Sequence, residues 1–116
     1  MNLNKVELIG NLTKDPEIKT TPTGTKIATF SIATNSKWKD KATGEFKEEV
    51  EYHNLVAIGK LAEIVEQYVK KGDKLYTDGK LKYRTWEDPS GNKRNSTEIL
   101  IMNMIMLGKK NENVEV

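Results

Sequence analysis

Residues 60–73 read KLAEIVEQYVKKGD, and here the spacing of the apolar side chains changes from that of a strand to that of a helix. Leu61, Ile64, Val65 and Tyr68 recur at i, i+3, i+4 and i+7, which is one face of an α-helix. Gly72 is well placed to end it. The stretch therefore predicts one helix, over residues 60–69, in a chain whose other apolar patterns are β-like.

Five segments around this helix have the composition of β-strands. They are residues 4–13, 26–36 and 48–58 before the helix, and 74–86 and 96–107 after it. Residues 15–25 hold two prolines and a glycine and predict a turn region around a short strand. Long polar loops are expected at the two remaining stretches, 37–47 and 87–95.

The resulting order, β-β-β-α-β-β, predicts a mainly β protein. It fits a five-stranded Greek-key barrel of the OB type, with one helix between strands 3 and 4. An open two-layer α+β domain would give the same order. A chain of 116 residues suits one domain. We place that domain at residues 1–108 and expect a short polar tail at 109–116.

The composition argues against most catalytic chemistry. The chain has no cysteine, which excludes disulfides, thiol catalysis and cysteine-ligated metals. Its one histidine, His53, has no histidine partner for a metal, and a structural role is the simpler interpretation. No phosphate-binding glycine loop of the G-x-x-x-x-G-K-[ST] type occurs. We expect no enzyme, no cofactor and no metal site.

Neither a signal peptide nor an apolar run of membrane-spanning length occurs in the sequence. We therefore expect a cytoplasmic protein without membrane contact. The net charge of +2 does not by itself announce a nucleic-acid binder, so the distribution of charge must carry that argument.

Alternate side chains of a strand face opposite sides of a sheet, so strand phase predicts which residues lie together. In residues 74–86 one phase carries three cations and a tryptophan: Lys80, Lys82, Arg84 and Trp86. In residues 48–58, Tyr52 and Ile58 share the phase opposite to Leu55 and predict an outward row. Trp38 stands between two lysines at the mouth of the first polar loop.

This pattern suits a single strand of nucleic acid. Cations hold its phosphates through counterion release. Exposed aromatic rings stack on its unpaired bases, which contributes roughly 1–3 kcal/mol per base and tolerates any base sequence. The alternative is that Trp38 and Trp86 only cover the edges of loops. Taken with the cationic row and the OB-like order, the aromatic residues favour nucleic-acid binding.

Long stretches of the chain resemble the DNA-binding domain of bacterial-type single-stranded DNA-binding proteins. The resemblance runs from Asn4 to about Leu107 and includes NKVELIGNLTKDPE, TPTGTKIATFSIATN and RTWEDPSGNKR. It implies an OB fold that coats single-stranded DNA, without strong sequence preference, during replication, recombination and repair.

The resemblance also implies roles for single residues. Trp38 and Trp86 match tryptophans that stack on bases. Tyr52 stands where many members have another tryptophan, and Ile58 where many have a stacking phenylalanine that an aliphatic side chain cannot replace. Two residues, Lys82 and Arg84, match basic positions of the groove. His53 matches a histidine near the subunit contacts.

The expected partners are single-stranded DNA and further copies of the chain, with a homotetramer as the first expectation and a dimer as the second. The strands offer more apolar surface than one small core needs, notably at Leu55, Ala57 and the apolar run near Met102. Members usually continue into a tail whose acidic tip recruits partner enzymes. The last residues, NENVEV, lack that tip, which argues against tail-mediated replication partners. The expected location is the cytoplasm, at the nucleoid, and an organellar or phage origin stays open.

Two rival functions remain at this stage. One is an RNA-binding OB module, which competition between a dT oligonucleotide and an RNA of equal length would distinguish. The other is an OB adaptor that binds only proteins, and it would show no quenching of tryptophan fluorescence by single-stranded DNA.

Overall fold

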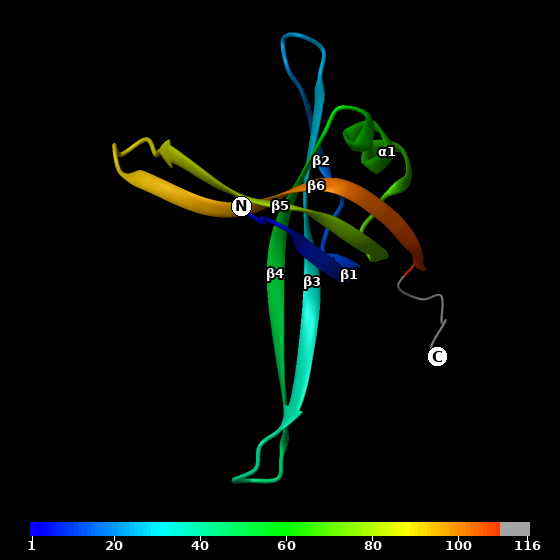
Figure 1. The fold of residues 1–116 in the computed structure, drawn as a ribbon, viewed down its shortest axis with the longest axis vertical. Coiled ribbons are helices and arrows are strands. Elements are labelled where there is room, and N and C mark those ends of the chain that lie inside the picture. Colours follow the sequence, from blue (N-terminus) through cyan, green and yellow to red (C-terminus); the bar gives the residue numbers. More distant parts are fainter. Residues whose placement is uncertain (110–116) are drawn as a thin grey trace.

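The computed structural model describes residues 1–109. Within them lie six strands and one helix (Figure 1). The elements are β1 (Val6–Leu12), β2 (Glu17–Thr20), β3 (Lys26–Lys39), β4 (Phe46–Ile58), α1 (Lys60–Tyr68), β5 (Asp73–Glu87) and β6 (Lys93–Lys109). The predicted tail over residues 109–116 lies outside the described part of the chain, except that β6 runs through residue 109.

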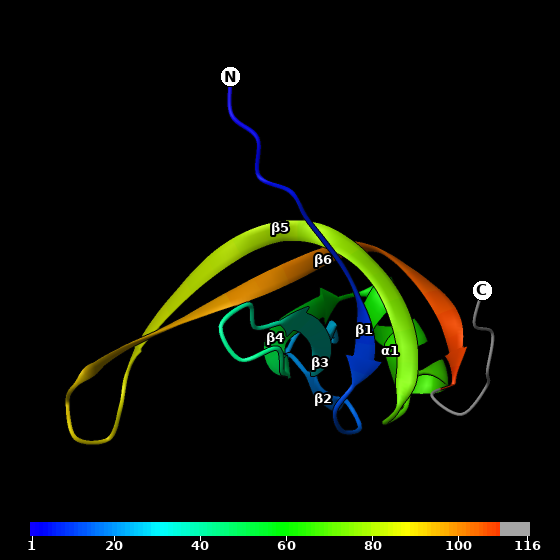
Figure 2. The same ribbon diagram turned by 90° about the horizontal axis from the view of Figure 1, so that it is seen from below.

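The strands form a closed barrel. Neighbours pair in the order β1-β5-β6-β4-β3, and pairing of β1 with β3 closes the ring. Among the strands of residues 1–109, β4 and β6 are the one pair that runs parallel, as the crossover of a Greek-key barrel requires. Figure 2 shows β5 and β6 arching together across β3 and β4. The predicted five-stranded barrel is therefore confirmed, and the open α+β alternative is wrong.

The short strand expected within residues 15–25 is β2, which pairs only with β3 and adds an edge to the barrel. The helix α1 connects β4 to β5. These two strands are the third and fourth of the barrel when β2 is left out, so the predicted place of the helix is confirmed.

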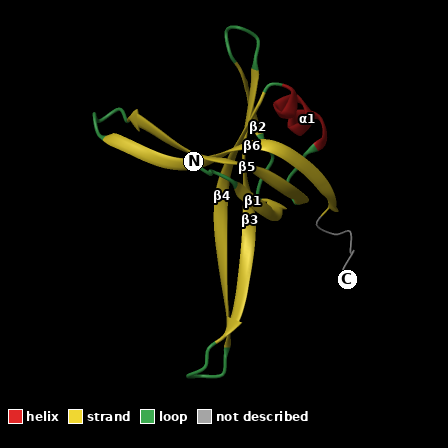
Figure 3. Ribbon diagram, viewed as in Figure 1, coloured by secondary structure: helices red, strands yellow, loops and turns green. Residues whose placement is uncertain are grey.

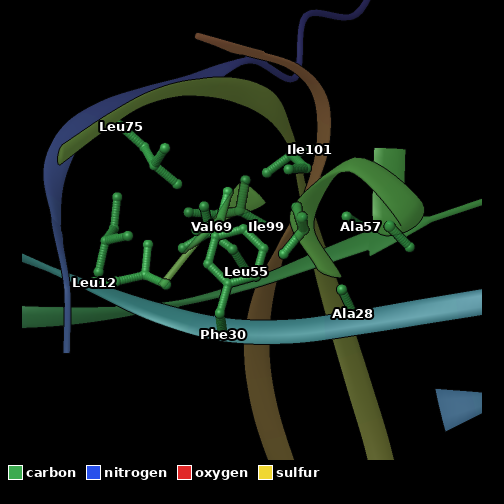
Figure 4. Close-up of a cluster of buried hydrophobic side chains, with 12 residues drawn as sticks. Leu12, Ala28, Phe30, Leu55, Ala57, Val69, Leu75, Ile99 and Ile101 are labelled. Atoms are coloured by element: carbon green, nitrogen blue, oxygen red, sulfur yellow. The ribbon is translucent and has the colours of Figure 1, made fainter. Parts of the chain in front are cut away.

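Alternate side chains of the barrel strands fill its interior (Figure 4). Ala28, Phe30 and Ile32 are buried in β3, as the strand phase predicts. Leu55 and Ala57 of β4 are buried in the same core, at 1% and 0% exposed. The expectation that these two residues supply surface for assembly is wrong, because the barrel's own interior consumes them.

The helix packs with part of the predicted face, because Val65 is buried and Leu61 packs half-buried against the core. Its buried residues are Ala62 and Val65, and Val69, just after its end, is buried with them. Tyr68 is exposed instead. The helix also ends at Tyr68, before Gly72, and Val69 already has an extended backbone. In the turn that follows, the carbonyl of Gly72 accepts a bond from the side chain of Asn11 and its N–H donates to the carbonyl of Leu12. Contacts with β1 thus set the end of the turn.

One glycine marks a close crossing of strands. A Cβ at Gly79 would lie 2.7 Å from the Cα of Ile101 and would also meet the carbonyl oxygen of Leu100. The register between β5 and β6 shifts at this point, between Asp78 and Gly79. Only a residue without a side chain lets β5 bend over β6 here, since a bulge brings the two backbones together.

Both predicted polar loops are shorter than expected, because paired strands extend into them. β3 and β4 stay in register out to Lys39 and Phe46, and β5 and β6 out to Glu87 and Lys93, so each loop shrinks to a tight turn at the tip of an arm (Figure 3). Opposite charges face each other along the first arm, as Lys37 and Glu48 do at 4.0 Å. Polar residues on both faces hide such a ribbon from prediction, because it lacks the alternation that a buried face produces.

No helix in residues 1–109 has the length and hydropathy needed to span a membrane, and α1 has only nine residues.

Candidate nucleic-acid interface

The outer face of three neighbouring strands carries most of the predicted site. Val56 of β4 lies opposite Leu100 of β6, which in turn lies opposite Lys80 of β5. Farther along, Lys82 opposes Glu98 and Trp86 opposes Arg94. Side chains opposed in a sheet project from the same face. The cationic row of β5 therefore lies beside the outward row of β4, with β6 between them.

A hollow of about 260 Å³ opens on this outer face. Apolar side chains of β4 and β6 and charged side chains of β5 and β6 line it: Val56, Ile58, Leu100, Lys82, Tyr83, Arg84 and Glu98. Ile58 is 48% exposed, so it belongs to this surface and not to the core. The structure thus brings three predicted site residues together, and we call this cavity the Ile58 hollow.

Arg84 connects the hollow to Trp86. Its guanidinium carbon lies 5.1 Å from the centroid of the Trp86 ring. One of its terminal nitrogens lies 3.6 Å from a carboxylate oxygen of Glu98. A guanidinium over an aromatic ring is held by the quadrupole of the ring. Trp86, 41% exposed, therefore keeps its position beside the hollow without a core around it.

Trp86 projects from the β5–β6 arm, and Asp88 organises the turn at the tip of that arm. Its carboxylate accepts bonds from the backbone N–H groups of Ser90 and Asn92 and from the Nε of Arg94, at 2.9–3.0 Å. The bond from Asn92 and then that from Arg94 hold the pKa of Asp88 below its ordinary value. Hydrogen bonds to the ionised form have this effect. The arm thus ends in a turn built on an ionised carboxylate.

The β3–β4 arm carries the other predicted aromatic residues, Trp38 and Tyr52. Cross-strand register places Trp38 opposite Lys47, and Tyr52 opposite Ala33. Trp38 is an odd number of residues from Ala33, so the two rings project from opposite faces of the ribbon. Trp38 is 45% exposed and Tyr52 is exposed as well.

Charge also differs between the two faces of the β3–β4 arm. Lys37 and Lys39, the sequence neighbours of Trp38, lie on the Tyr52 face because adjacent residues of a strand alternate. Glu49 and Glu51 lie on the Trp38 face. Lys37 and Lys39 therefore do not share a surface with Trp38.

Phe46 is a candidate that sequence reasoning missed. It is exposed at the tip of the β3–β4 arm and has the same strand phase as Tyr52, opposite Lys39. The signal in the sequence is an aromatic residue within a charged stretch, but the polar composition of residues 37–47 predicts a loop there. A strand interpretation would have placed Phe46, Tyr52 and the two lysines on one face.

A second, smaller hollow of about 150 Å³ adjoins the first. Residues of β3, β4 and the chain around β2 line it, together with Glu98: Lys14, Glu17, Thr29, Phe30, Ser31, Asn54 and Leu55. Glu98 lines both cavities, so its carboxylate lies at their shared boundary.

His53 does not belong to this surface. Its Nε2 lies 2.8 Å from the hydroxyl of Thr34 in a half-buried pair, on the core side of β4 opposite Ile32. Among residues 1–109, no three side chains of His, Cys, Asp or Glu are grouped to hold a metal ion. The candidate site itself consists of exposed rings, cations and apolar hollows.

The seven predicted site residues thus fall into two groups. Ile58, Lys82, Arg84 and Trp86 lie around or beside the hollow, with Lys80 one step along the same row. Trp38 and Tyr52 lie on the β3–β4 arm, which extends away from the barrel in another direction from the β5–β6 arm (Figure 1). A ligand that reaches both groups must be long.

Comparisons with known proteins place the chain in a family. A model of the single-strand binding protein family matches residues 3–107. Single-stranded DNA-binding protein 1 of Xylella fastidiosa (strain 9a5c) is 50% identical over 115 residues, which are 99% of this chain and 85% of that protein.

Two solved structures share the fold. A Plasmodium falciparum SSB in complex with ssDNA matches with a TM-score of 0.86 and 34% identity, over 92% of this chain and 97% of that chain. A deletion mutant of the single-stranded DNA binding protein from Thermus aquaticus matches with a TM-score of 0.78 and 31% identity. That match covers 90% of this chain and 50% of the other.

Proposed function

The chain belongs to the single-strand binding protein family, and from this premise we propose that it binds and coats single-stranded DNA. The observation that carries the proposal is the row Lys82, Arg84 and Trp86 beside the Ile58 hollow. Cations, an exposed ring and an apolar floor lie on one face of the barrel, as a strand of phosphates and unstacked bases requires. The chain is a binding protein and not an enzyme.

We propose that phosphates track the cations while bases occupy the rings and the hollow. Lys80, Lys82 and Arg84 neutralise phosphates and release counterions, which makes binding dependent on salt and independent of base sequence. Bases stack on Trp86 and, along the other arm, on Trp38, Tyr52 and Phe46. Ile58 covers a base with its methyl groups and offers no ring. A duplex cannot use these contacts, because its bases already stack on each other.

This surface suits replication, recombination and repair, in which duplexes open and leave bases unpaired. Such DNA arises at the nucleoid, so we propose the cytoplasm as the place where the protein acts. Binding by stacking tolerates every base sequence, and a protein of this kind protects any strand it meets.

We also propose that the chain assembles into a homotetramer, with a dimer as the alternative. Exposed apolar side chains on β1 and β6 support this proposal: Ile9, Met102, Ile105, Met106 and Leu107. Large apolar patches on a folded protein commonly mark contacts with other proteins. Sedimentation equilibrium at micromolar concentration should give the mass of four chains. A mass of one chain would refute both assemblies.

The direct test of DNA binding is a fluorescence titration with dT oligonucleotides of increasing length. Tryptophan emission should fall on binding, and affinity should rise until the oligonucleotide spans both arms. An RNA of equal length serves as competitor, and a duplex serves as the negative control. Preference for the RNA would favour an RNA-binding module, and unchanged emission with every ligand would favour a protein adaptor.

A further inference from the structure

A carboxylate lies within the surface that we propose for a polyanion. Glu98 lines both hollows, directly opposite Lys82 on the neighbouring strand. Its side chain is 19% exposed, so it is partly shielded yet still accessible to a ligand. A negative charge there repels phosphates. If the surface bound only the DNA backbone, this carboxylate would lower its affinity.

Glu98 retains capacity to accept hydrogen bonds. A carboxylate offers two oxygens with about four acceptor positions. Among residues 1–109, its polar contact is the ion pair with Arg84, at 3.6 Å, which is longer than a hydrogen bond. The guanidinium offsets the charge of Glu98 without saturating its oxygens. Those oxygens therefore remain available to N–H donors of a ligand in the hollow.

The Ile58 hollow has the dimensions and lining for one base. Its volume of about 260 Å³ lies below the roughly 300–1,000 Å³ of pockets for drug-sized ligands. Val56, Ile58 and Leu100 offer an apolar floor to a flat ring. In a single strand the Watson–Crick edge of that ring is unpaired and can turn to a side chain.

We propose that Glu98 reads the base in this hollow and favours guanine. Guanine presents two adjacent N–H donors, at N1 and at the exocyclic amine, which match the two oxygens of a carboxylate. Thymine presents one N–H between two carbonyl oxygens, and those oxygens repel the carboxylate. Glu98 thus gives an otherwise sequence-tolerant surface a preference at one position.

This inference rests on the proposed binding of single-stranded DNA, and its test compares two strands that differ in one amino group. Preferences of such proteins ordinarily follow stacking strength, so the comparison must hold stacking nearly constant. Hypoxanthine is guanine without the exocyclic amine. We would measure the affinity of the full chain for repeating d(TG) and d(TI) oligonucleotides of equal length, in a lithium buffer that prevents guanine quadruplexes.

The wild-type protein should bind d(TG) roughly fivefold more tightly than d(TI), the lower end of what a bidentate base contact gives. Glu98→Gln should bring the ratio close to one, because the amide replaces one acceptor with a donor. Glu87→Gln removes the same charge from the same arm, on the strand phase opposite to Trp86, and should keep the wild-type ratio.

A ratio of one in the wild-type protein overturns the inference, whether or not the variants fold. So does a wild-type ratio that persists in a folded Glu98→Gln variant. Glu98→Gln also removes a negative charge, so it can raise the affinity for every strand, dT included. The ratio of d(TG) to d(TI) affinity is unaffected by such a general gain and therefore decides the test. Failure to bind any single strand would instead refute the proposed function.

Discussion

The guanidinium of Arg84 lies over the ring of Trp86, with 5.1 Å between its central carbon and the ring centroid. One face of the indole is therefore covered before any DNA arrives. A base must stack either on the opposite face of the ring or on the outer plane of the guanidinium, because both are flat and delocalised. Arg84 then acts as part of the stacking platform as well as a counter-charge for phosphate.

Arg84→Lys should separate these two roles. Lysine keeps the positive charge, so the dependence of log K on log salt should stay at its wild-type slope. It lacks the planar guanidinium, so the affinity for dT oligonucleotides should fall by about 0.5–2 kcal/mol, the range of a cation–π contact. Wild-type affinity in the lysine variant would show that Arg84 contributes to binding only through its positive charge.

Trp38→Ala and Trp86→Ala should each weaken binding by roughly 1–3 kcal/mol and leave the melting temperature nearly unchanged, because both rings lie outside the core. The chain has two tryptophans, so each variant leaves one reporter whose quenching describes its own arm. Tyr68→Ala is the matched control, since that ring is exposed on α1. Equal affinities for all three variants and the wild-type protein would exclude stacking on both arms.

Lys82→Ala should weaken binding to every base sequence alike. The loss of one phosphate contact lowers the salt slope by roughly 0.7 for a single strand. Lys60, an exposed lysine at the start of α1, is not among the residues that line the hollow. Lys60→Ala removes the same charge and should leave the slope unchanged. If both variants behave alike, Lys82 contributes only to the net charge.

Ile58→Phe should strengthen binding to single-stranded DNA and leave duplex binding unchanged. The side chain lines the hollow and is 48% exposed, so a ring has room to meet a base. The gain should be near the lower end of roughly 1–3 kcal/mol, because ordering the ring and the base costs entropy. Ile58→Leu, which adds no ring, should show no such gain. A sharp fall in melting temperature with unchanged affinity would make Ile58 a core residue.

The turn at the tip of the β5–β6 arm should loosen in acid. The pKa of Asp88 is depressed in the folded protein, chiefly by the backbone N–H of Asn92 and then by Arg94. The Asp88 carboxylate therefore contributes its full stabilisation above the unfolded pKa of about 3.9. This contribution is lost as the pH falls through the lower pKa of the folded state. The NMR shift of the Asn92 amide should report a midpoint below 3.9.

Asp88→Asn is the control for this titration. The amide cannot ionise, so the shift of the Asn92 amide should not move between pH 5 and pH 2. A midpoint at or above 3.9 in the wild-type protein would contradict the hydrogen bonds seen at this turn.

The sequence by itself determined which way the strands of the barrel face. Phe30 points inward and Ile58 outward, as predicted, because a side-chain period of two leaves an apolar phase wherever one face is buried. It also determined that one helix interrupts the strands after residue 58, since the period changes there. Strand phase placed Lys82, Arg84 and Trp86 in one row for the same reason.

Only the tertiary structure decided the extent of the two arms and the place of Glu98, because the sequence carries no periodic signal for them. The sequence predicts loops over residues 37–47 and 87–95, but the strands of both arms extend into these stretches. There neither face of the ribbon meets a core, so the sequence carries no apolar alternation. Trp38 accordingly lies on the face opposite to its neighbouring lysines, which a loop interpretation could not show. Glu98 meets the Ile58 hollow through the pairing of β6 with both β4 and β5. The pairing with β4 joins residues far apart in sequence, such as Val56 and Leu100. It depends on closure of the whole barrel, which no local pattern encodes.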